Sequence, residues 1–157
     1  MIEREIERLI IMPKRIIESS SKEFSEEYQH FRRDFKLQSI DGNYKFRMFI
    51  RKHKEFQENF SIGLDLLPSP DKGMPLIRCN GPHYVTEDIL KPSPHYDYHI
   101  HMIKNDDIEK DIRKLSFAEI TDRYNSYKEA LDYFIKRTNI INANDYFDFQ
   151  KSLFGDL

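Results

Sequence analysis

The sequence has a single cysteine, Cys79, among 157 residues. One thiol excludes a disulfide within the chain and is typical of a protein from a reducing compartment. Three of the first five residues are charged, and the N-terminus lacks the apolar core of a signal peptide. No apolar run approaches the roughly 20 residues that cross a bilayer as a helix. We therefore expect a cytoplasmic protein with no membrane partner.

The chain also lacks a surplus of positive charge. Lysine and arginine number 25 against 27 aspartates and glutamates, which gives a net charge of −2. This balance provides no overall attraction to nucleic acid, so any basic surface has to be local. Tryptophan is absent, but 12 phenylalanines and 9 tyrosines suit a sheet better than a helical bundle. The length fits one domain, and we expect a single α+β domain over residues 1–157.

Alternating apolar and polar residues predict most of the sheet. The Asp41-Gly42 pair between two alternating runs is the strongest hairpin signal in the chain. Short connections favour an antiparallel meander. We expect four to six strands, which include residues 14–20, 35–38, 44–51, 60–66, 76–80 and 96–103.

Helical patterns are found at both ends of the chain. Apolar spacing predicts a helix over residues 2–11 and another over 23–32. Ser116 and Ser126, each followed three residues later by glutamate, have the spacing of a capping box and predict helices after them. Residues 144–154 could form a last short helix. The C-terminal helices are expected to pack on one face of the sheet.

Side chains alternate between the two faces of a strand, so the predicted register divides the residues into two sets. The apolar set, which includes Phe46, Met48, Ile50, Ile62 and Leu64, must be covered by the helices. The opposite face is expected to be polar, and a shift of one residue would turn it toward the core. It carries Arg47, Arg51, Asp65, Arg78, Asn80, His99 and His101.

Four of the six histidines lie within residues 83–101, beside this polar face. Histidine titrates near neutral pH and serves as acid or base, while arginine binds phosphate and stabilises developing negative charge. Cleavage of RNA or of a nucleotide phosphodiester needs both residue types, and it needs no metal cofactor. The leading hypothesis assigns catalysis to His99, His101 and His83, and phosphate binding to Arg78, Arg47 and Arg51.

Three other interpretations remain open. His83, His99 and His101 could bind a divalent transition metal, with His95, Asp97 or Asp65 as further ligands. The basic and aromatic residues could instead form a non-catalytic module that binds single-stranded nucleic acid or a protein. The same face could also be the solvated side of an antiparallel sheet, with cross-strand polar pairs and no chemistry. Cys79 is expected to be a buried small residue.

Three segments resemble a group of small uncharacterised bacterial proteins. These share an Arg-x-Asn/Asp-Gly-x-His segment, a strand that ends in His-x-His, and a C-terminal helix that begins near a Tyr-x-Ser/Asp pattern. The matching residues here are 78–83, 99–101 and 124–131. Such proteins are similar in size and layout to toxins of toxin–antitoxin pairs and to mobile-element proteins. The resemblance implies an activity directed at RNA, with a cognate antitoxin or another protein as partner.

Overall fold

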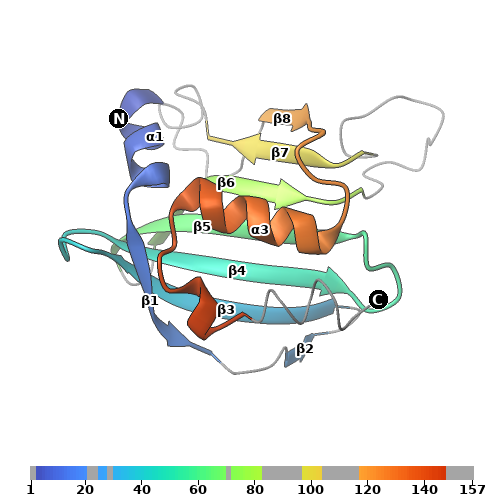
Figure 1. Ribbon diagram of the computed structural model, residues 1–157, viewed down its shortest axis with the longest axis horizontal. Coiled ribbons are helices and arrows are strands. Elements are labelled where there is room, and N and C mark those ends of the chain that lie inside the picture. Colours follow the sequence, from blue (N-terminus) through green and yellow to red (C-terminus); the bar gives the residue numbers. More distant parts are fainter. Residues whose placement is uncertain are drawn as a thin grey trace.

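The computed structural model describes residues 3–20, 25–27, 30–69, 72–82, 97–103 and 117–147. In this part of the chain, eight strands form one sheet, and α3 lies across one of its faces (Figure 1). No helix among these residues is long and apolar enough to cross a membrane. The elements are α1 (Glu3–Ile11), β1 (Lys14–Ser19), β2 (Ser25–Glu27), β3 (His30–Ser39), β4 (Lys45–His53), β5 (Phe60–Ser69), β6 (Lys72–Asn80), β7 (His99–Met102), β8 (Phe117–Ile120), α3 (Tyr127–Thr138) and the 3₁₀ turn η2 (Ala143–Asp145).

The sheet is an antiparallel meander, as predicted. Its order is β1-β3-β4-β5-β6-β7-β8, and β2 pairs with β3 next to β1. Every strand from β3 to β7 pairs with the strand that follows it in sequence. The α+β class is therefore confirmed, but the sheet has more strands than the four to six expected.

The first hairpin forms at the predicted Asp41-Gly42 turn. Gly42 has a φ of 81°, in the left-handed region that glycine tolerates. The carboxylate of Asp41 accepts hydrogen bonds from Ser39 Oγ at 2.6 Å and from the backbone N–H of Asn43 at 2.9 Å. This turn fixes the register of β3 against β4, and with it the division between the two faces.

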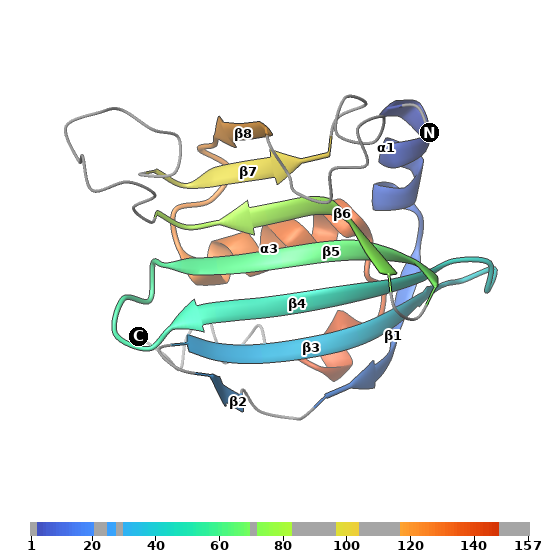
Figure 2. The ribbon, with the colours of Figure 1, turned by 180° about the vertical axis from the view of Figure 1, so that it is seen from behind.

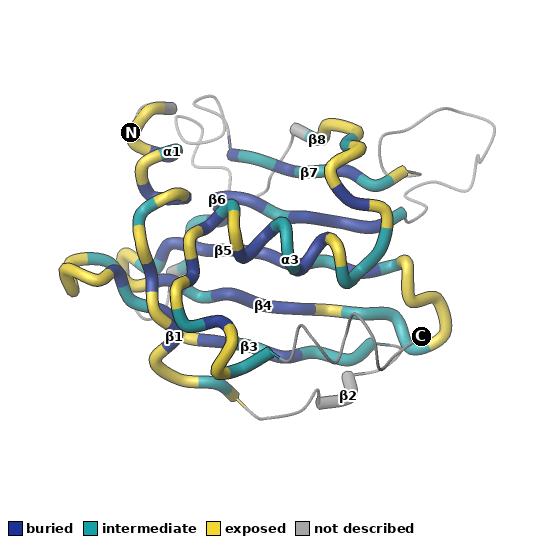
Figure 3. Tube along the Cα trace, viewed as in Figure 1, coloured by how far each residue is buried: buried dark blue, intermediate teal, exposed yellow. Residues whose placement is uncertain are grey.

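The hydrophobic core lies between the sheet and the helices α1 and α3. Ser126 caps α3 as predicted, because its Oγ accepts the backbone N–H of Glu129 at 3.1 Å. The helix buries one side against β5 and β6 and exposes the other, as the burial colours show (Figure 3). Core residues from the helices and the central strands are Ile6, Leu9, Ile10, Phe46, Met48, Ile50, Ile62, Leu64, Ile77, Cys79, Ala130, Phe134 and Ile135.

Two predicted helices are strands. The apolar spacing over residues 23–32 predicts a helix, but Ser25–Glu27 forms β2 and β3 begins at His30. The capping-box spacing of Ser116 and Glu119 predicts a second helix, but Phe117–Ile120 forms β8 against β7. Of the expected helix over 144–154, the structure describes residues up to 147, where η2 is a single 3₁₀ turn.

Lys14 is fully buried where α1 and α3 end. Its Nζ donates hydrogen bonds to the carbonyl oxygens of Ile10 at 2.6 Å, Met12 at 2.9 Å and Thr138 at 2.9 Å. Carbonyl groups at helix C-termini favour a nearby cation. Burial, with the charge of Arg137 as a smaller cause, nevertheless lowers the pKa of Lys14 from 10.5 to about 7. One side chain therefore joins the ends of both helices to the first strand.

Asn142 covers part of the outer edge of β1. Its Oδ1 accepts the backbone N–H of Ile16 at 2.8 Å, and its Nδ2 donates to the carbonyl of Ile16 at 3.0 Å. The backbone N–H of Ile141 also donates to the carbonyl of Lys14 at 2.9 Å. The amide side chain thus supplies the two hydrogen bonds that a neighbouring strand would otherwise make.

Candidate functional site

The face of the sheet turned away from α3, here called the open face, is seen from the front in Figure 2. Cross-strand pairing places two rows of residues side by side on it. The first row runs Asp34, Phe49, Gly63, Arg78 and His101, from β3 to β7. The second row runs Arg32, Arg51, Ser61, Asn80 and His99.

Arg47 and Asp65 pair across β4 and β5 on the same face. The sequence predicts that seven residues share one polar face, and the structure confirms it. These residues are Arg47, Arg51, Asp65, Arg78, Asn80, His99 and His101.

The ring of Phe49 lies against Gly63, its neighbour in the first row. An added Cβ at Gly63 would come within 2.3 Å of the ring edge. The guanidinium carbons of Arg78 and Arg32 lie 5.2 and 5.6 Å from the centre of the ring. Phe49 is only 8% exposed, so its ring holds arginines in place and is not a platform on which a nucleic-acid base could stack.

Arg78 stands at the middle of the first row, opposite His101. Within the described part of the chain, its guanidinium forms no hydrogen bond and no ion pair, and its buried Nε has no acceptor. Burial lowers the pKa of Arg78, and the charges of Arg47 and Arg32 lower it further, while Asp65 raises it. Three guanidinium groups and one carboxylate therefore interact electrostatically around this position.

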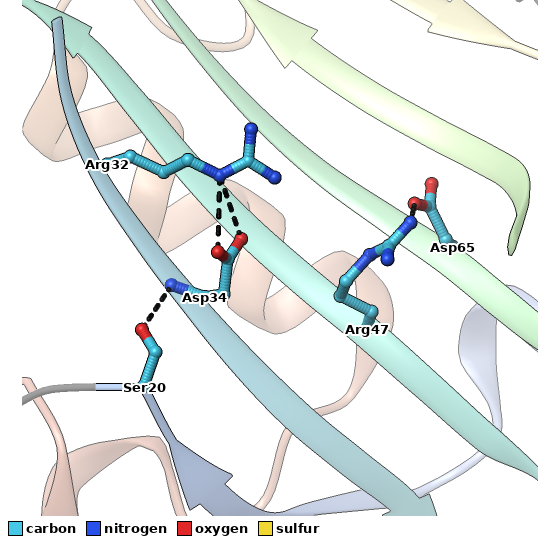
Figure 4. A network of polar contacts seen from close by, with 5 residues as sticks. All are labelled: Ser20, Arg32, Asp34, Arg47 and Asp65. Atoms are coloured by element: carbon cyan, nitrogen blue, oxygen red, sulfur yellow. Dashed lines mark hydrogen bonds and ion pairs between the residues drawn. The ribbon is translucent and has the colours of Figure 1, made fainter. Parts of the chain in front are cut away.

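The carboxylate of Asp65 is the counter-charge that acts on Arg78. Its Oδ2 accepts a hydrogen bond from Arg47 at 2.8 Å (Figure 4). Asp65 is 4% exposed, and its other oxygen, Oδ1, has no donor, just as the buried Nε of Arg47 has no acceptor. Buried polar atoms without partners are rare in native proteins and are often satisfied by a bound group. Arg47, Asp65 and Arg78 thus each have a buried polar atom that can form one further hydrogen bond.

Arg32 is held by a second carboxylate. Its Nε lies 3.2 Å from both oxygens of Asp34, and the backbone N–H of Asp34 donates to Ser20 Oγ at 3.1 Å (Figure 4). This ion pair is about one-third exposed on each side, which leaves it accessible to solvent. The open face therefore carries four arginines and two aspartates. The arginines are Arg32, Arg47, Arg51 and Arg78, and the aspartates are Asp34 and Asp65.

His99 is fully buried and is held at both ring nitrogens. Its Nδ1 lies 2.8 Å from the carbonyl oxygen of Asp97, which can only accept, so Nδ1 carries the proton. Its Nε2 lies 3.3 Å from the amide nitrogen of Asn80, whose oxygen accepts from Ser61 Oγ at 2.6 Å. This chain of hydrogen bonds fixes the orientation of the His99 ring.

His101 occupies the neighbouring position on β7. Its ring centre lies 4.9 Å from that of His99, edge to face. The side chain is 9% exposed and stands across from Arg78. Of the two histidines, His101 is the one next to an arginine and nearer to solvent.

Tyr124 supports β6 and β7 from the core side, at Asn80 and His99. Its hydroxyl donates to the carbonyl of His99 at 2.7 Å and lies 3.0 Å from the carbonyl of Asn80. Burial raises the pKa of Tyr124 and raises that of the neighbouring Cys79 thiol to about 12. Cys79 is buried, as expected, and its thiol remains protonated at neutral pH.

Of the remaining predicted residues, Arg51 is exposed and lies beside Ser61 in the second row. His83 and His95 lie outside the described residues, so a role for either stays a prediction. Among the residues described, no three histidine, cysteine, aspartate or glutamate side chains are grouped as metal ligands. A metal site at His99 and His101 would also have to displace the hydrogen bonds of His99.

Sequence reasoning missed Arg32 and Asp34 because it placed them in or beside a helix. The alternation that would have found them is broken by Arg33, which faces the core side at 8% exposure and lies over the rings of Phe35 and Phe147. Gly63 offered a further signal, because a glycine within a strand often marks a close approach by another group.

In comparisons with protein-family models, curated proteins and solved structures, the chain matches none.

Proposed function

We propose that the open face binds the phosphodiester of RNA or of a nucleotide, and that this chain is a small toxin-like enzyme that cleaves it without a metal. The observation that carries the proposal is the placement of Arg78. A guanidinium with hydrogen-bonding capacity in reserve lies across from His101 and within electrostatic reach of two further arginines. A planar guanidinium binds phosphate through two parallel hydrogen bonds, and a phosphate would satisfy the buried Nε.

The surplus of positive charge supports an anionic ligand. Four arginines share the face with two aspartates, although the whole chain has a net charge of −2. A phosphate between Arg78 and Arg47 would also compete with Asp65 for the Arg47 guanidinium. This local excess is what a phosphodiester needs as its charge grows toward the transition state.

His101 is the proposed acid and base, and His99 positions it. A base has to exchange a proton, whereas both nitrogens of His99 are held by Asp97 and Asn80. In the proposed reaction His101 takes the proton of the ribose 2′-hydroxyl, and the 2′-oxygen forms a bond to phosphorus. The bond from phosphorus to the 5′-oxygen breaks, and that oxygen receives a proton from the imidazolium. The products are a 2′,3′-cyclic phosphate and a 5′-hydroxyl.

The test uses untagged protein, a single-stranded RNA oligonucleotide and the DNA of the same sequence, in the presence of EDTA. We expect the RNA alone to be cleaved, with a cyclic phosphate end. His101→Ala should slow cleavage by about 100-fold or more, which is the usual contribution of a general acid or base. Arg78→Gln should slow it by a similar factor. Arg4→Gln, on the exposed side of α1, is the matched control and should leave the rate unchanged.

Three results would contradict the proposal. Full activity of His101→Ala would remove the assigned base. Binding of RNA without cleavage would favour a non-catalytic nucleic-acid module. Loss of cleavage in EDTA and its return with zinc or manganese would favour the metal alternative. Expression in bacteria adds a test of the toxin-like role, in which wild-type protein should slow growth and degrade RNA while His101→Ala does neither.

A further inference from the structure

β8 is the last strand of the sheet, and its outer edge is not paired with another described strand. The backbone N–H of Thr121 donates to the carbonyl of Tyr98 at 2.9 Å, which marks these residues as a hydrogen-bonded pair. Hydrogen-bonded and non-bonded pairs alternate along antiparallel strands. The backbone groups of Ala118 and Ile120 therefore point away from β7, toward the outer edge. An edge of this kind accepts an additional strand.

A cavity of about 370 Å³ lies directly beside this edge, between β8 and α3. Its floor is apolar and consists of Ile77, Ile100 and Met102. Tyr133 and Arg137, which are four residues apart on α3, form the opposite wall. This volume accommodates a large aliphatic side chain with room for neighbouring atoms.

The rim of the cavity has more negative than positive charge available. Glu119 and Asp122 are exposed and form no ion pair in the described part of the structure. Arg137 is neutralised by Glu7 at 2.8 Å, and Arg123 lies over the ring of Tyr133 at 5.9 Å. The two available carboxylates favour a basic partner at this rim.

From these features we infer that the β8 edge and the adjoining cavity bind an extended segment of a partner protein as an additional strand. The segment has a large aliphatic side chain that enters the cavity, and basic residues two positions to either side of it. Backbone hydrogen bonds to Ala118 and Ile120 hold the segment, and the cavity selects its central side chain. On the opposite face of the added strand, apolar residues cover Ile120, which is 58% exposed.

This site is separate from the proposed phosphate site. The cavity opens on the α3 side of the sheet, whereas Arg78 and His101 lie on the open face. The inference therefore stands whether or not the protein cleaves RNA.

The experiment is an NMR titration of ¹⁵N-labelled protein with the capped peptide Thr-Lys-Val-Leu-Val-Lys-Thr. We expect saturable binding with a Kd below about 1 mM. Shifts should concentrate at Ala118, Ile120 and the cavity residues. Replacing the central leucine of the peptide by alanine should weaken binding about tenfold, and replacing both lysines by glutamate should do the same.

Two variants at position 118 distinguish backbone hydrogen bonding from nonspecific binding of the peptide. Ala118→Pro removes an N–H that points outward and should weaken binding about tenfold. Ala118→Val keeps the N–H and is the matched control, with an unchanged Kd. Glu119→Lys with Asp122→Lys changes only exposed positions, so it tests the charge argument even if the proline variant fails to fold.

The inference is overturned by any of four results. These are no saturation at millimolar peptide, shifts centred on Arg78 and the open face, equal affinity for the lysine and glutamate peptides, and unchanged binding by a folded Ala118→Pro variant. Sedimentation as a dimer that Ala118→Pro dissociates would overturn it as well, because a second copy of the chain would then occupy the edge.

Discussion

Gly63 determines where the ring of Phe49 lies, and through it the placement of Arg78. A side chain at position 63 would collide with the ring, which is enclosed by Arg32 and Arg78. Gly63→Ala should therefore destabilise the protein by about 1–3 kcal/mol, the usual cost of overpacking. Urea denaturation measures the change. The double variant Gly63→Ala with Phe49→Leu should recover part of the loss, and a Gly63→Ala protein as stable as wild type would contradict the packing argument.

Lys14 makes stability depend on pH in a defined direction. Its pKa is about 7 in the folded protein and returns to its ordinary value of 10.5 on unfolding. Between these values the unfolded chain binds more protons, so the contribution of Lys14 to the free energy of unfolding rises with pH. Relative to Lys14→Met, wild type should gain on the order of 1–3 kcal/mol between pH 7 and pH 9.

Thermal or urea unfolding of both proteins at several pH values measures this difference, and other titrating groups cancel in the comparison. A difference that stays constant, or that falls as the pH rises, would show that the three carbonyl groups keep Lys14 protonated throughout.

At the scale of elements, the edge of β1 depends on one side chain. Asn142 supplies both hydrogen bonds to Ile16, which is 2% exposed. Asn142→Ala leaves a buried N–H and C=O without partners and should cost about 1–3 kcal/mol. Asn144→Ala, an exposed position two residues away, is the control and should change the free energy of unfolding by less than about 0.5 kcal/mol. Equal stability of the two variants would show that solvent replaces Asn142.

The strands with clean alternation could be predicted from the sequence, and the short ones could not. Residues 60–66 alternate without interruption, and an Asp-Gly turn fixes the preceding hairpin, so local signals agree with the fold. β8 has only four residues, and its conformation depends on pairing with β7, which is remote in sequence. The capping-box spacing of Ser116 and Glu119 is a local signal that this pairing overrides. The same spacing at Ser126 succeeds, because Ala130 and Phe134 pack on the core.

For the molecule as a whole, the sign of the net charge conceals how the charge is distributed. The chain carries −2, yet the open face brings four arginines together. If these bind RNA phosphates, the logarithm of the affinity should fall with the logarithm of salt concentration, by about 0.7 per phosphate contact. We expect a slope of about −2 to −3, reduced by about 0.7 in Arg78→Gln. Fluorescence anisotropy at several salt concentrations measures it.

Arg4→Gln should leave this slope unchanged, because α1 lies away from the open face. A slope near zero in the wild-type protein would indicate that the ligand is not a polyanion.

The membership of the open face could be predicted, but its internal contacts could not. Alternation within their strands places Arg47 and Asp65 on one face. Arg78 is assigned to that face by analogy with these strands, and the structure agrees for all three. Which atoms meet depends on register between strands, and on the space that Gly63 and Gly73 leave. An added Cβ at Gly73 would lie 2.8 Å from the Arg47 guanidinium. Fixation of His99 by the Asp97 carbonyl likewise follows from backbone geometry, which residue types do not encode.

The meander has a consequence for how this surface could evolve. Each residue of the first row comes from a different strand, and in the meander each strand is connected to the next one in the sheet. The row consists of Asp34, Phe49, Gly63, Arg78 and His101. Insertions or deletions in the connections, such as residues 54–59, leave every strand's register intact. A deletion of one residue inside β4 or β5 would instead exchange core and surface along that strand. Lineages descended from such a chain should therefore differ in loop length while the spacing within each strand stays constant.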